Sequence, residues 1–448
     1  MKTIYRKNLS KLLVISVPII LSNIISQLQT IIDRIFLGRL DDMYMSAIGN
    51  STSTMWTTMS FCFSVVMGAS ILISQAVGSG DEEHIEEYAG ALIKWNNVIP
   101  TILFFIWFFG SEGIFRIMGV SDKLMPLCLA YTKYYAPIFL IVGFGASFSV
   151  IFQTSGNTKP LVAYGIIRSG LNVILDWIMI FGHFGCPAMG IKGAAIATTI
   201  AEYAGSIYAL AIYIRSKDLK TKPSFGSVLK ARLGSYIKGF RLGLNTALED
   251  FAWNFGNLML IRLLNTINDK AAGIYTTVFS IEVFAVVVIG GIGNGTVTLS
   301  GEARGRNDKE GFKATAIIAY TISAVTAFVV LLLCIFIPDK IVSLFTQDST
   351  VIASSSVYML IMGCNLFGKA MNIIIGNGIR GYGDTRWMFV TQMFGTCFVI
   401  GLACIFVLVL NWGIVGVFVA VLSDEFVRAV INAIKYVTLL KKWKPLNT

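Results

Sequence analysis

Polar and acidic side chains recur at helical spacing inside apolar runs of this chain. Ser22, Ser26, Gln29 and Asp33 are separated by four, three and four residues, which places them on one face of a helix. Inserting a carboxylate deep in a bilayer costs about 2.5 to 3.5 kcal/mol on the insertion scale. A functional role or a charged partner is therefore expected for Asp33. A salt bridge with Arg34 is the structural alternative, but adjacent residues point to different helix faces. We therefore interpret Asp33 as a proton-binding group, with Ser26 and Gln29 in its polar lining.

A second pair of stripes follows in the same half of the chain. Asn172 and Asp176 are four residues apart within an apolar run, and Thr198 and Glu202 repeat this spacing in the next run. Two carboxylates beside one polar pocket repel each other, and a shared proton relieves that repulsion. The pattern indicates proton carriage, and a structural hydrogen bond between helices is the alternative for Asp176.

The later half of the chain has a different set of charges. Positions 227 residues after Asp33 and Asp176 hold Leu260 and Ala403, so the acidic site is not duplicated. The polar residues inside its apolar runs are Asn245, Glu249, Asp250, Glu282, Asn365, Lys369 and Asn372. A buried lysine among buried carboxylates most simply pairs with one of them. We expect a structural ion pair for Lys369, with substrate contact as the alternative, and we include Glu249, Glu282 and Lys369 in the polar lining.

The elements that carry these residues are membrane spans. Of the 448 residues, 55% are hydrophobic and 14% are charged, whereas soluble domains contain about 25% charged residues. Apolar runs long enough to cross a hydrocarbon core of about 30 Å are predicted at 12–37, 46–77, 91–109, 126–152, 161–181, 190–214, 237–264, 271–300, 312–337, 351–377, 387–410 and 413–437. The fold class is therefore an all-α polytopic membrane protein with twelve transmembrane helices.

Lysine and arginine between the spans predict the orientation. With the N-terminus inside, the cytoplasmic segments hold 23 of these residues and the outer segments hold six. Both termini are then cytoplasmic, and the protein is a multi-pass protein of the cell (inner) membrane. The net charge of +11 is explained by this topology and does not indicate nucleic acid binding.

The chain contains two related halves. A shift of 227 residues aligns Gly68 with Gly295, Gly78 with Gly305 and several further identities, and a shift of 223 continues the match. Six spans per repeat give both halves the same direction, so a pseudo-twofold axis along the membrane normal must relate them. We expect an N-terminal six-helix lobe at 1–214, a basic cytoplasmic linker at 215–238 and a C-terminal lobe at 239–448. The second part of the linker, with the apolar residues Val228, Leu229, Leu233, Tyr236 and Ile237, could lie as an amphipathic helix on anionic lipid, and a solvated tether is the alternative.

The motifs taken together resemble the MATE (multidrug and toxic compound extrusion) family over essentially the whole chain. They are Pro18, D-R-I-F-L-G at 33–38, I-S-Q-A-V-G-S-G-D at 73–81, G-N-T-K-P at 156–160, N-x-x-x-D at 172–176 and G-A-A-I-A-T at 193–198. The resemblance implies two six-helix lobes in a V shape. It also implies a secondary antiporter that works by alternating access and exports amphipathic, often cationic, drugs in exchange for H⁺ or Na⁺.

The resemblance also assigns roles to individual residues. Asp33, Asn172 and Asp176 match the cation site of the N-terminal lobe, where Na⁺ could bind, and we add Thr198 beside them. Pro18 matches the proline implicated in bending of the first helix. No cofactor other than the coupling ion is expected, the partners are a small-molecule substrate and membrane lipid, and we expect a monomer.

One departure separates this chain from NorM-like members. These carry a Glu in the seventh helix and an Asp in the tenth, where this chain has Trp253 and Lys369, with Glu249 one turn early. The departure favours DinF-like members, with coupling in the N-terminal lobe.

Three other classes of protein are alternatives to this interpretation. A major facilitator transporter also has six plus six spans, but its loop after the second span is typically basic, whereas 79–87 is acidic here. An enzyme is not expected, because the two histidines lie far apart and the seven cysteines form no paired motif. A lipid or oligosaccharide flippase of the same superfamily has the same fold and stays as the alternative function.

Overall fold

The computed structural model describes residues 2–38, 40, 42–268, 270–344 and 349–445. The helices of the first half are α1 (Lys2–Gly38), α2 (Asp42–Ser79), α3 (Glu82–Trp95), α4 (Val98–Ile117), α5 (Met125–Tyr135), η1 (Ala136–Ile138), α6 (Phe139–Thr154), α7 (Lys159–Phe181) and α8 (Ile191–Arg215). Those that follow are α9 (Phe225–Lys230), α10 (Leu233–Leu264), α11 (Ala271–Gly305), α12 (Lys309–Phe336), α13 (Pro338–Val342), α14 (Ser349–Tyr382), α15 (Thr385–Cys404), η2 (Ile405–Val409) and α16 (Gly413–Lys441).

Each predicted span falls on one long helix or on two or three consecutive helical segments. The third span corresponds to α3 and α4, the fourth to α5, η1 and α6, and the eleventh to α15 and η2. Ten segments in the described residues are long and apolar enough to cross a membrane. The other two spans are α10 and α16, of 32 and 29 residues. The prediction of an all-helical polytopic fold with twelve long helices is confirmed.

The chain forms two compact units. One contains Met1–Ile20, Ser74–Gly80 and Asn245–Thr448, and the other contains Leu21–Ile73 and Asp81–Leu244. Helix α1 changes from one unit to the other two residues after Pro18, which lies inside the helix. Because proline lacks a backbone N–H and crowds the preceding turn, α1 is weakest near this change of unit.

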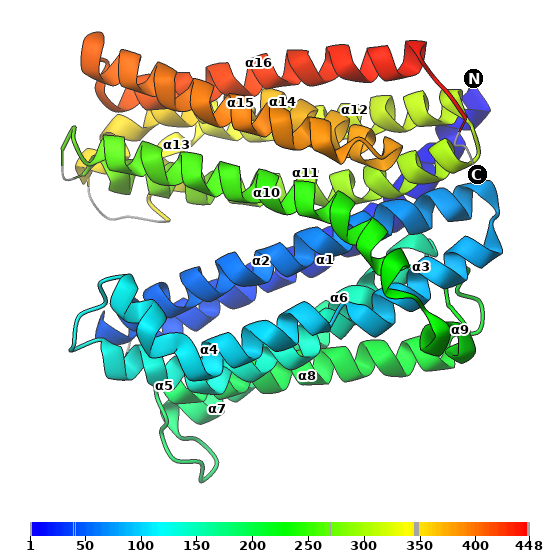
Figure 1. The fold of residues 1–448 in the computed structure, drawn as a ribbon. Helices are drawn as coiled ribbons and strands as arrows, with labels where there is room; N and C mark the ends of the chain where they lie inside the picture. Colours follow the sequence, from blue (N-terminus) through cyan, green and yellow to red (C-terminus); the bar gives the residue numbers. More distant parts are fainter. Residues whose placement is uncertain (1, 39, 41, 269, 345–348, 446–448) are drawn as a thin grey trace. The chain divides into compact units, whose positions relative to one another are not determined.

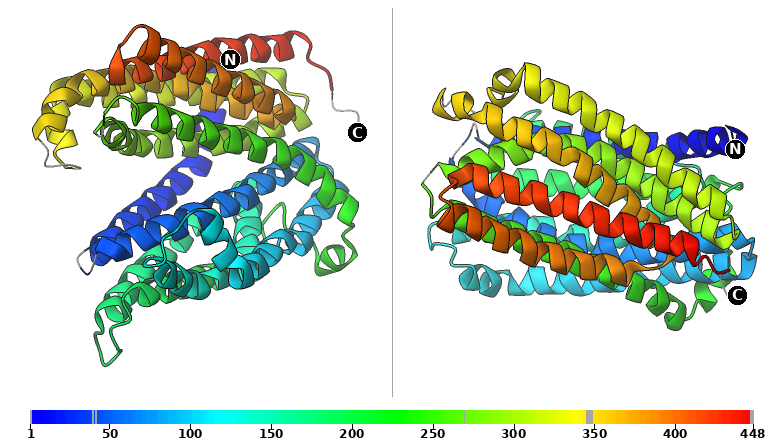
Figure 2. Two further views of the ribbon diagram at one scale, coloured as in Figure 1. Left: turned by 60° about the vertical axis from the view of Figure 1, so that its left-hand side comes forward. Right: turned by 90° about the horizontal axis from the view of Figure 1, so that it is seen from above.

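The unit that contains the later half is a bundle built around α14. This helix packs against α11, α12 and α16, and α15 lies beside α16 (Figures 1 and 2). Its apolar core includes Leu264, Met359, Leu366, Ala370 and Val417, all fully buried.

The other unit is built around α8. This helix packs against α5, α6 and α7 (Figure 1), and the core includes the large side chains of Trp107, Phe115 and Phe139. Helix α7 begins with Pro160 in its first turn and ends at Gly182, which has left-handed backbone angles and donates its N–H to Ile178.

Two glycines that match in the repeat make reciprocal contacts between α2 and α11. A methyl group on Gly78 would overlap the carbonyl oxygen of Glu302, and one on Gly305 would overlap the carbonyl oxygen of Gln75. Gln75 and Glu302 are themselves 227 positions apart, so the two contacts exchange under the repeat. The repeat found in the sequence is therefore also present in the packing, and only glycine allows so close a crossing.

Both ends of the chain lie on the same side of their bundle. Near the N-terminus, Asn8 donates to the carbonyl oxygen of Gly311 at 3.0 Å. Near the C-terminus, Trp443 donates to Asn307 Oδ1 at 2.6 Å. Both contacts are made to the turn between α11 and α12 and the start of α12, as an even number of spans requires.

The basic segment between the halves packs on the acidic start of α3. Ser227 donates to Glu86 and Ser235 to Glu87, while Lys94 donates to the carbonyl oxygen of Leu229 at 2.6 Å. Helix α10 begins at Leu233, inside the expected linker. The idea of a helix from Val228 to Ile237 lying on lipid is wrong, because Tyr236 is buried against α3 and Ala231 is not helical.

The acidic start of α3 is a helix cap. Asp81 accepts hydrogen bonds from the backbone N–H of His84 at 3.0 Å and lies 2.7 Å from its ring, and these contacts lower the pKa of Asp81. The interpretation of 81–87 as an acidic first turn is confirmed.

Candidate functional site

Helix α7 presents four polar side chains on one face. Tyr164, Arg168, Asn172 and Asp176 are each four residues apart, so they are stacked along the helix. Asn172 and Asp176 are almost completely buried, with exposures of 1% and 0%. The second part of α1 and the first part of α8 provide their partners.

The stripe on α1 meets this face as the sequence predicts. Gln29 donates to Asp33 Oδ2 at 3.1 Å and accepts from the hydroxyl of Ser169 at 3.1 Å. Arg34 is exposed, whereas Asp33 is half-buried on the side of Gln29. The structure therefore places Asp33 in the polar cluster and gives no support to the alternative of a pair with Arg34.

Asn172 connects the two carboxyl groups. When its amide nitrogen faces them, it lies 3.0 Å from Asp33 Oδ1 and 3.3 Å from Asp176 Oδ2, and its oxygen lies 3.1 Å from the hydroxyl of Thr198. In this orientation the amide nitrogen donates to both carboxyl groups while the amide oxygen accepts from Thr198.

Asp176 has spare acceptor capacity. Its Oδ1 atom is buried and has no hydrogen-bond partner among the described residues. The carboxyl groups of Asp33 and Asp176 both approach the amide nitrogen of Asn172, at 3.0 and 3.3 Å. Two carboxylates that meet at one amide group repel each other unless a proton or another cation is bound beside them.

Glu202 has a different environment from the two aspartates. It accepts from Tyr164 at 2.5 Å and from Arg168 at 3.2 Å, and Arg168 also donates to Ser26. This buried ion pair ties together α1, α7 and α8. The structure thus brings together the seven predicted site residues of this half: Glu202 and Ser26 lie in an ion-pair cluster, next to Gln29, Asp33, Asn172, Asp176 and Thr198.

In the later half, Lys369 pairs with Glu282. The two charged atoms are 2.7 Å apart, and Asn365 donates to the same carboxylate oxygen at 3.1 Å. The expectation of a buried ion pair for Lys369 is confirmed. Glu249 pairs instead with Arg380 at 2.5 Å, so of the three carboxylates considered it is Glu282 that holds the lysine.

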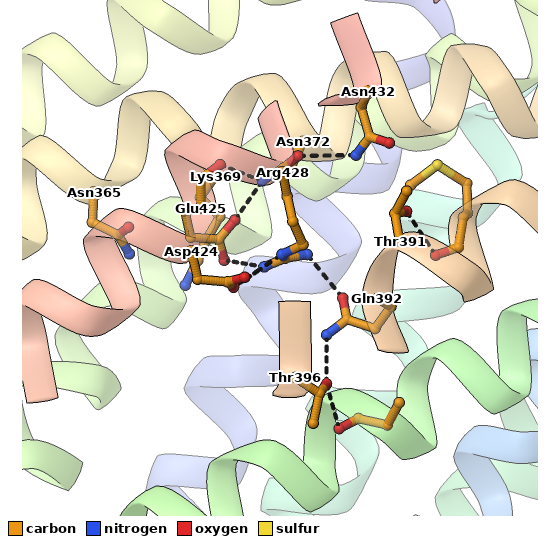
Figure 3. Close-up of polar contacts among 12 residues, drawn as sticks. Asn365, Lys369, Asn372, Thr391, Gln392, Thr396, Asp424, Glu425, Arg428 and Asn432 are labelled. Atoms are coloured by element: carbon orange, nitrogen blue, oxygen red, sulfur yellow. Dashed lines mark hydrogen bonds and ion pairs between the residues drawn. The ribbon is translucent and has the colours of Figure 1, made fainter. Parts of the chain in front are cut away.

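Helix α16 supplies a charged cluster that the sequence interpretation missed. Arg428 contacts Asp424 at 2.8 Å and Glu425 at 3.1 Å, and it donates to Gln392 at 2.9 Å (Figure 3). Asn372 donates to Glu425 at 2.7 Å, which connects this cluster to α14. The signal was present, because three charges at helical spacing stand inside an apolar run at 413–437.

The sequence interpretation also missed Tyr164 and Arg168, although the sequence contains a signal for them. Their spacing of four residues continues the stripe of Asn172 and Asp176 toward the start of α7.

Within the described chain, no group of three or more His, Cys, Asp or Glu side chains could hold a metal ion.

A repeated, twelve-helix membrane fold with buried polar clusters in each half is the plan of many secondary transporters. The MatE family model matches residues 18–178 and 246–405, which are the corresponding parts of the two halves. The chain therefore belongs to the MatE family, whose members are transporters.

Several known proteins are similar along nearly their whole length. The chain is 26% identical to "Uncharacterized transporter YisQ" of Bacillus subtilis, with 89% of this chain and 88% of that protein covered. It is 25% identical to "Probable multidrug resistance protein NorM" of Thermotoga maritima, with 98% and 93% covered. A solved outward-facing multidrug resistance MATE transporter of the MOP superfamily superposes with a TM-score of 0.90 at 18% identity, covering 98% of this chain and 97% of that one.

Proposed function

We propose that this protein is an antiporter that exports amphipathic organic compounds, cationic ones among them, in exchange for protons. The observation that carries the proposal is the buried cluster in which Asn172 lies between the carboxyl groups of Asp33 and Asp176. The names of several relatives, which describe multidrug resistance proteins, support the choice of substrate.

Protonation of Asp33 or Asp176 changes the hydrogen bonds that Asn172 can make with these two carboxyl groups. With both carboxyl groups ionised, the amide nitrogen serves them as a donor. With one of them protonated, its O–H is itself a donor, so the amide nitrogen no longer has two ionised acceptors beside it. Proton binding therefore alters the contacts that join α1 to α7 and α8. Since α1 contains Pro18 and changes compact unit just after it, we propose that these contacts set the bend of α1 and thereby the access of substrate.

Sodium is the alternative coupling ion at this position. Carboxylate, amide and hydroxyl oxygens are suitable ligands for a hard cation, and Asp33, Asn172, Asp176 and Thr198 provide them. We favour the proton because two carboxyl groups that approach the same amide repel each other when both are ionised, and protonation of one of them relieves this repulsion. We also keep the DinF-like assignment as a proposal, because Lys369 occupies the tenth span where an acid would be expected for the NorM-type site.

Exchange in reconstituted vesicles tests the proposal. Purified protein in vesicles with an internal pH indicator is exposed to ethidium in sodium-free buffer, and we expect substrate-dependent proton movement that stops when the pH gradient is collapsed. Vesicles without protein provide the baseline. Substrate movement that requires Na⁺ and moves no proton would overturn the choice of ion, and labelled lipid crossing the bilayer without ethidium transport would favour a flippase.

Orientation provides a separate prediction. We propose that both termini and the segment 215–238 are cytoplasmic, because of the excess of lysine and arginine there. A cysteine at the open position Gly226 should resist an impermeant thiol reagent in intact cells and react after the cells are permeabilised. Phe184→Cys, at a position 86% exposed in the opposite loop, should react in both conditions. The reverse pattern would invert the topology.

A further inference from the structure

A third buried carboxyl group lies one helical turn from the two aspartates. Arg168 precedes Asn172 by four residues on α7, and its partner Glu202 follows Thr198 by four residues on α8. Four residues correspond to about 6 Å along a helix. Because Asn172 contacts Thr198, the pair of Arg168 and Glu202 forms a second level next to the aspartate cluster. Glu202 is therefore a potential third proton-binding group.

Both carboxylate oxygen atoms of Glu202 have a donor. Oε1 accepts from the hydroxyl of Tyr164 at 2.5 Å, and Oε2 accepts from Arg168 at 3.2 Å. Asp176, in contrast, has a buried oxygen atom without a partner among the described residues. Donors that bind a carboxylate favour its ionised form. The geometry therefore keeps Glu202 ionised and leaves Asp176 free to bind a proton.

The two members of the pair differ in exposure. The side chain of Glu202 is 7% exposed, and that of Arg168 is 27% exposed. A buried carboxylate that has no cation beside it binds a proton instead of staying charged, whereas arginine keeps its charge in proteins. The ionisation of Glu202 therefore depends on Arg168, and the charge of Arg168 does not depend on Glu202.

The elements that surround Glu202 in the described chain bring no second cation into contact with it. Helix α5 provides Tyr135, a neutral phenol that interacts electrostatically with the pair, and Lys133, which is exposed. Neither η1 nor α6 contains an ionisable side chain. Helix α1 provides Ser26, a neutral acceptor for Arg168. Arg168 is thus the counter-ion of Glu202.

We propose that Arg168 is a positioning residue that confines proton exchange to Asp33 and Asp176, because it holds Glu202 as a permanent carboxylate. The inference rests on the proposed proton antiport and states what limits the number of exchanging groups. Arg168 also donates to Ser26, seven residues before Asp33 on α1. The same guanidinium therefore joins α1 to α8 next to the exchange site.

The two members of the pair should have different effects when they are removed. Arg168→Met leaves Glu202 buried without a cation, so Glu202 should take up a proton from water. Glu202→Gln leaves a positive charge one turn from Asn172, and a nearby positive charge disfavours proton binding by carboxyl groups. Removing both charges together should leave the aspartates close to their original electrostatic environment.

Infrared spectroscopy tests the first effect without transport, because a protonated carboxyl group and a carboxylate absorb at different frequencies. The background is the full chain with Asp33→Asn and Asp176→Asn in detergent at neutral pH, where exposed carboxyl groups are ionised. Adding Arg168→Met should produce the band of one more protonated carboxyl group per chain. Adding Glu202→Gln as well should remove this band. Arg168→Lys, which keeps a cation, should not produce it.

The pH dependence of ethidium export in vesicles tests the second effect in the otherwise unchanged chain. The pH above which export falls to half of its maximum should move down by about one unit in Glu202→Gln. It should return close to the original value when Arg168→Met is added. A purely structural role would lower the rate without moving this pH. The matched control is Arg116→Met, which breaks an exposed pair on α4 and should leave this pH unchanged.

The proposal is overturned if Arg168→Met, still folded by its melting transition, adds no protonated carboxyl group to the background. Arg168→Gln, which keeps a donor but no charge, takes its place if Arg168→Met does not fold. The proposal is also overturned if Glu202→Gln exports ethidium with an unchanged pH profile. If the infrared band appears as expected but the original chain moves no protons in vesicles, the proposed function fails while the dependence of Glu202 on Arg168 stands.

Discussion

Asp33→Asn is expected to reduce proton-driven export to the level of vesicles without protein, while the protein still folds and inserts. An asparagine keeps the shape of the side chain and the contact with Gln29, which lies 3.1 Å away. It cannot bind a proton, so Asp176 loses the group with which it shares one. Coupling, rather than folding, is therefore the property that this change removes.

The measurement is ethidium exchange under a pH gradient at matched protein amounts, together with thermal unfolding. Glu112→Gln is the control, since Glu112 pairs with Arg116 on the exposed end of α4 at 2.7 Å and its loss should leave export unchanged. Asp33→Glu should retain part of the activity. Active export by Asp33→Asn at the wild-type rate would refute the assignment of this residue.

Lys369→Met should have the largest effect on stability. Removing the lysine leaves Glu282 buried without its cation, and breaking a buried pair costs about 3 to 5 kcal/mol. The side chains of the pair are 10% and 6% exposed, so water cannot replace the lost partner. The melting temperature in detergent should fall by several degrees, and a second change, Glu282→Met, should recover much of the loss.

A pair in the same half provides the comparison. Lys435 and Asp384 are also 2.7 Å apart, but their side chains are 21% and 30% exposed. Lys435→Met should therefore cost at most about 1 kcal/mol, as partly exposed pairs do. If Lys369→Met leaves the melting temperature unchanged and alters which compounds are exported, the lysine contacts substrate and its pairing with Glu282 is incidental to stability.

Much of the architecture follows from local patterns. A run of about 20 apolar residues must form a helix in lipid, because the backbone has no other way to satisfy its hydrogen bonds. For this reason the twelve spans could be located from the sequence, and the helix breaks within three of them could not. The break at Asn96 and Asn97, between α3 and α4, is an example, because both amides donate to backbone carbonyl groups of α6.

The stripes of polar residues could also be predicted from the sequence, because spacing by three and four residues places side chains on one face of a helix. Spacing cannot tell which face meets which. The sequence predicts that Lys369 needs a carboxylate, but Glu249, Asp250 and Glu282 satisfied that rule equally well. Only the packing of α11 against α14 assigns Glu282 to it and leaves Glu249 for Arg380.

The sequence by itself therefore determined the class of fold, the repeat, and the carboxylates Asp33 and Asp176 that a bilayer would not tolerate without a function. Tertiary structure alone decided that Asn172 lies between them, that Arg168 pairs with Glu202, and that Lys369 pairs with Glu282. The physical reason is that hydropathy and helical period are properties of one segment, whereas a charge pair or a cavity depends on the distance between segments far apart in the chain.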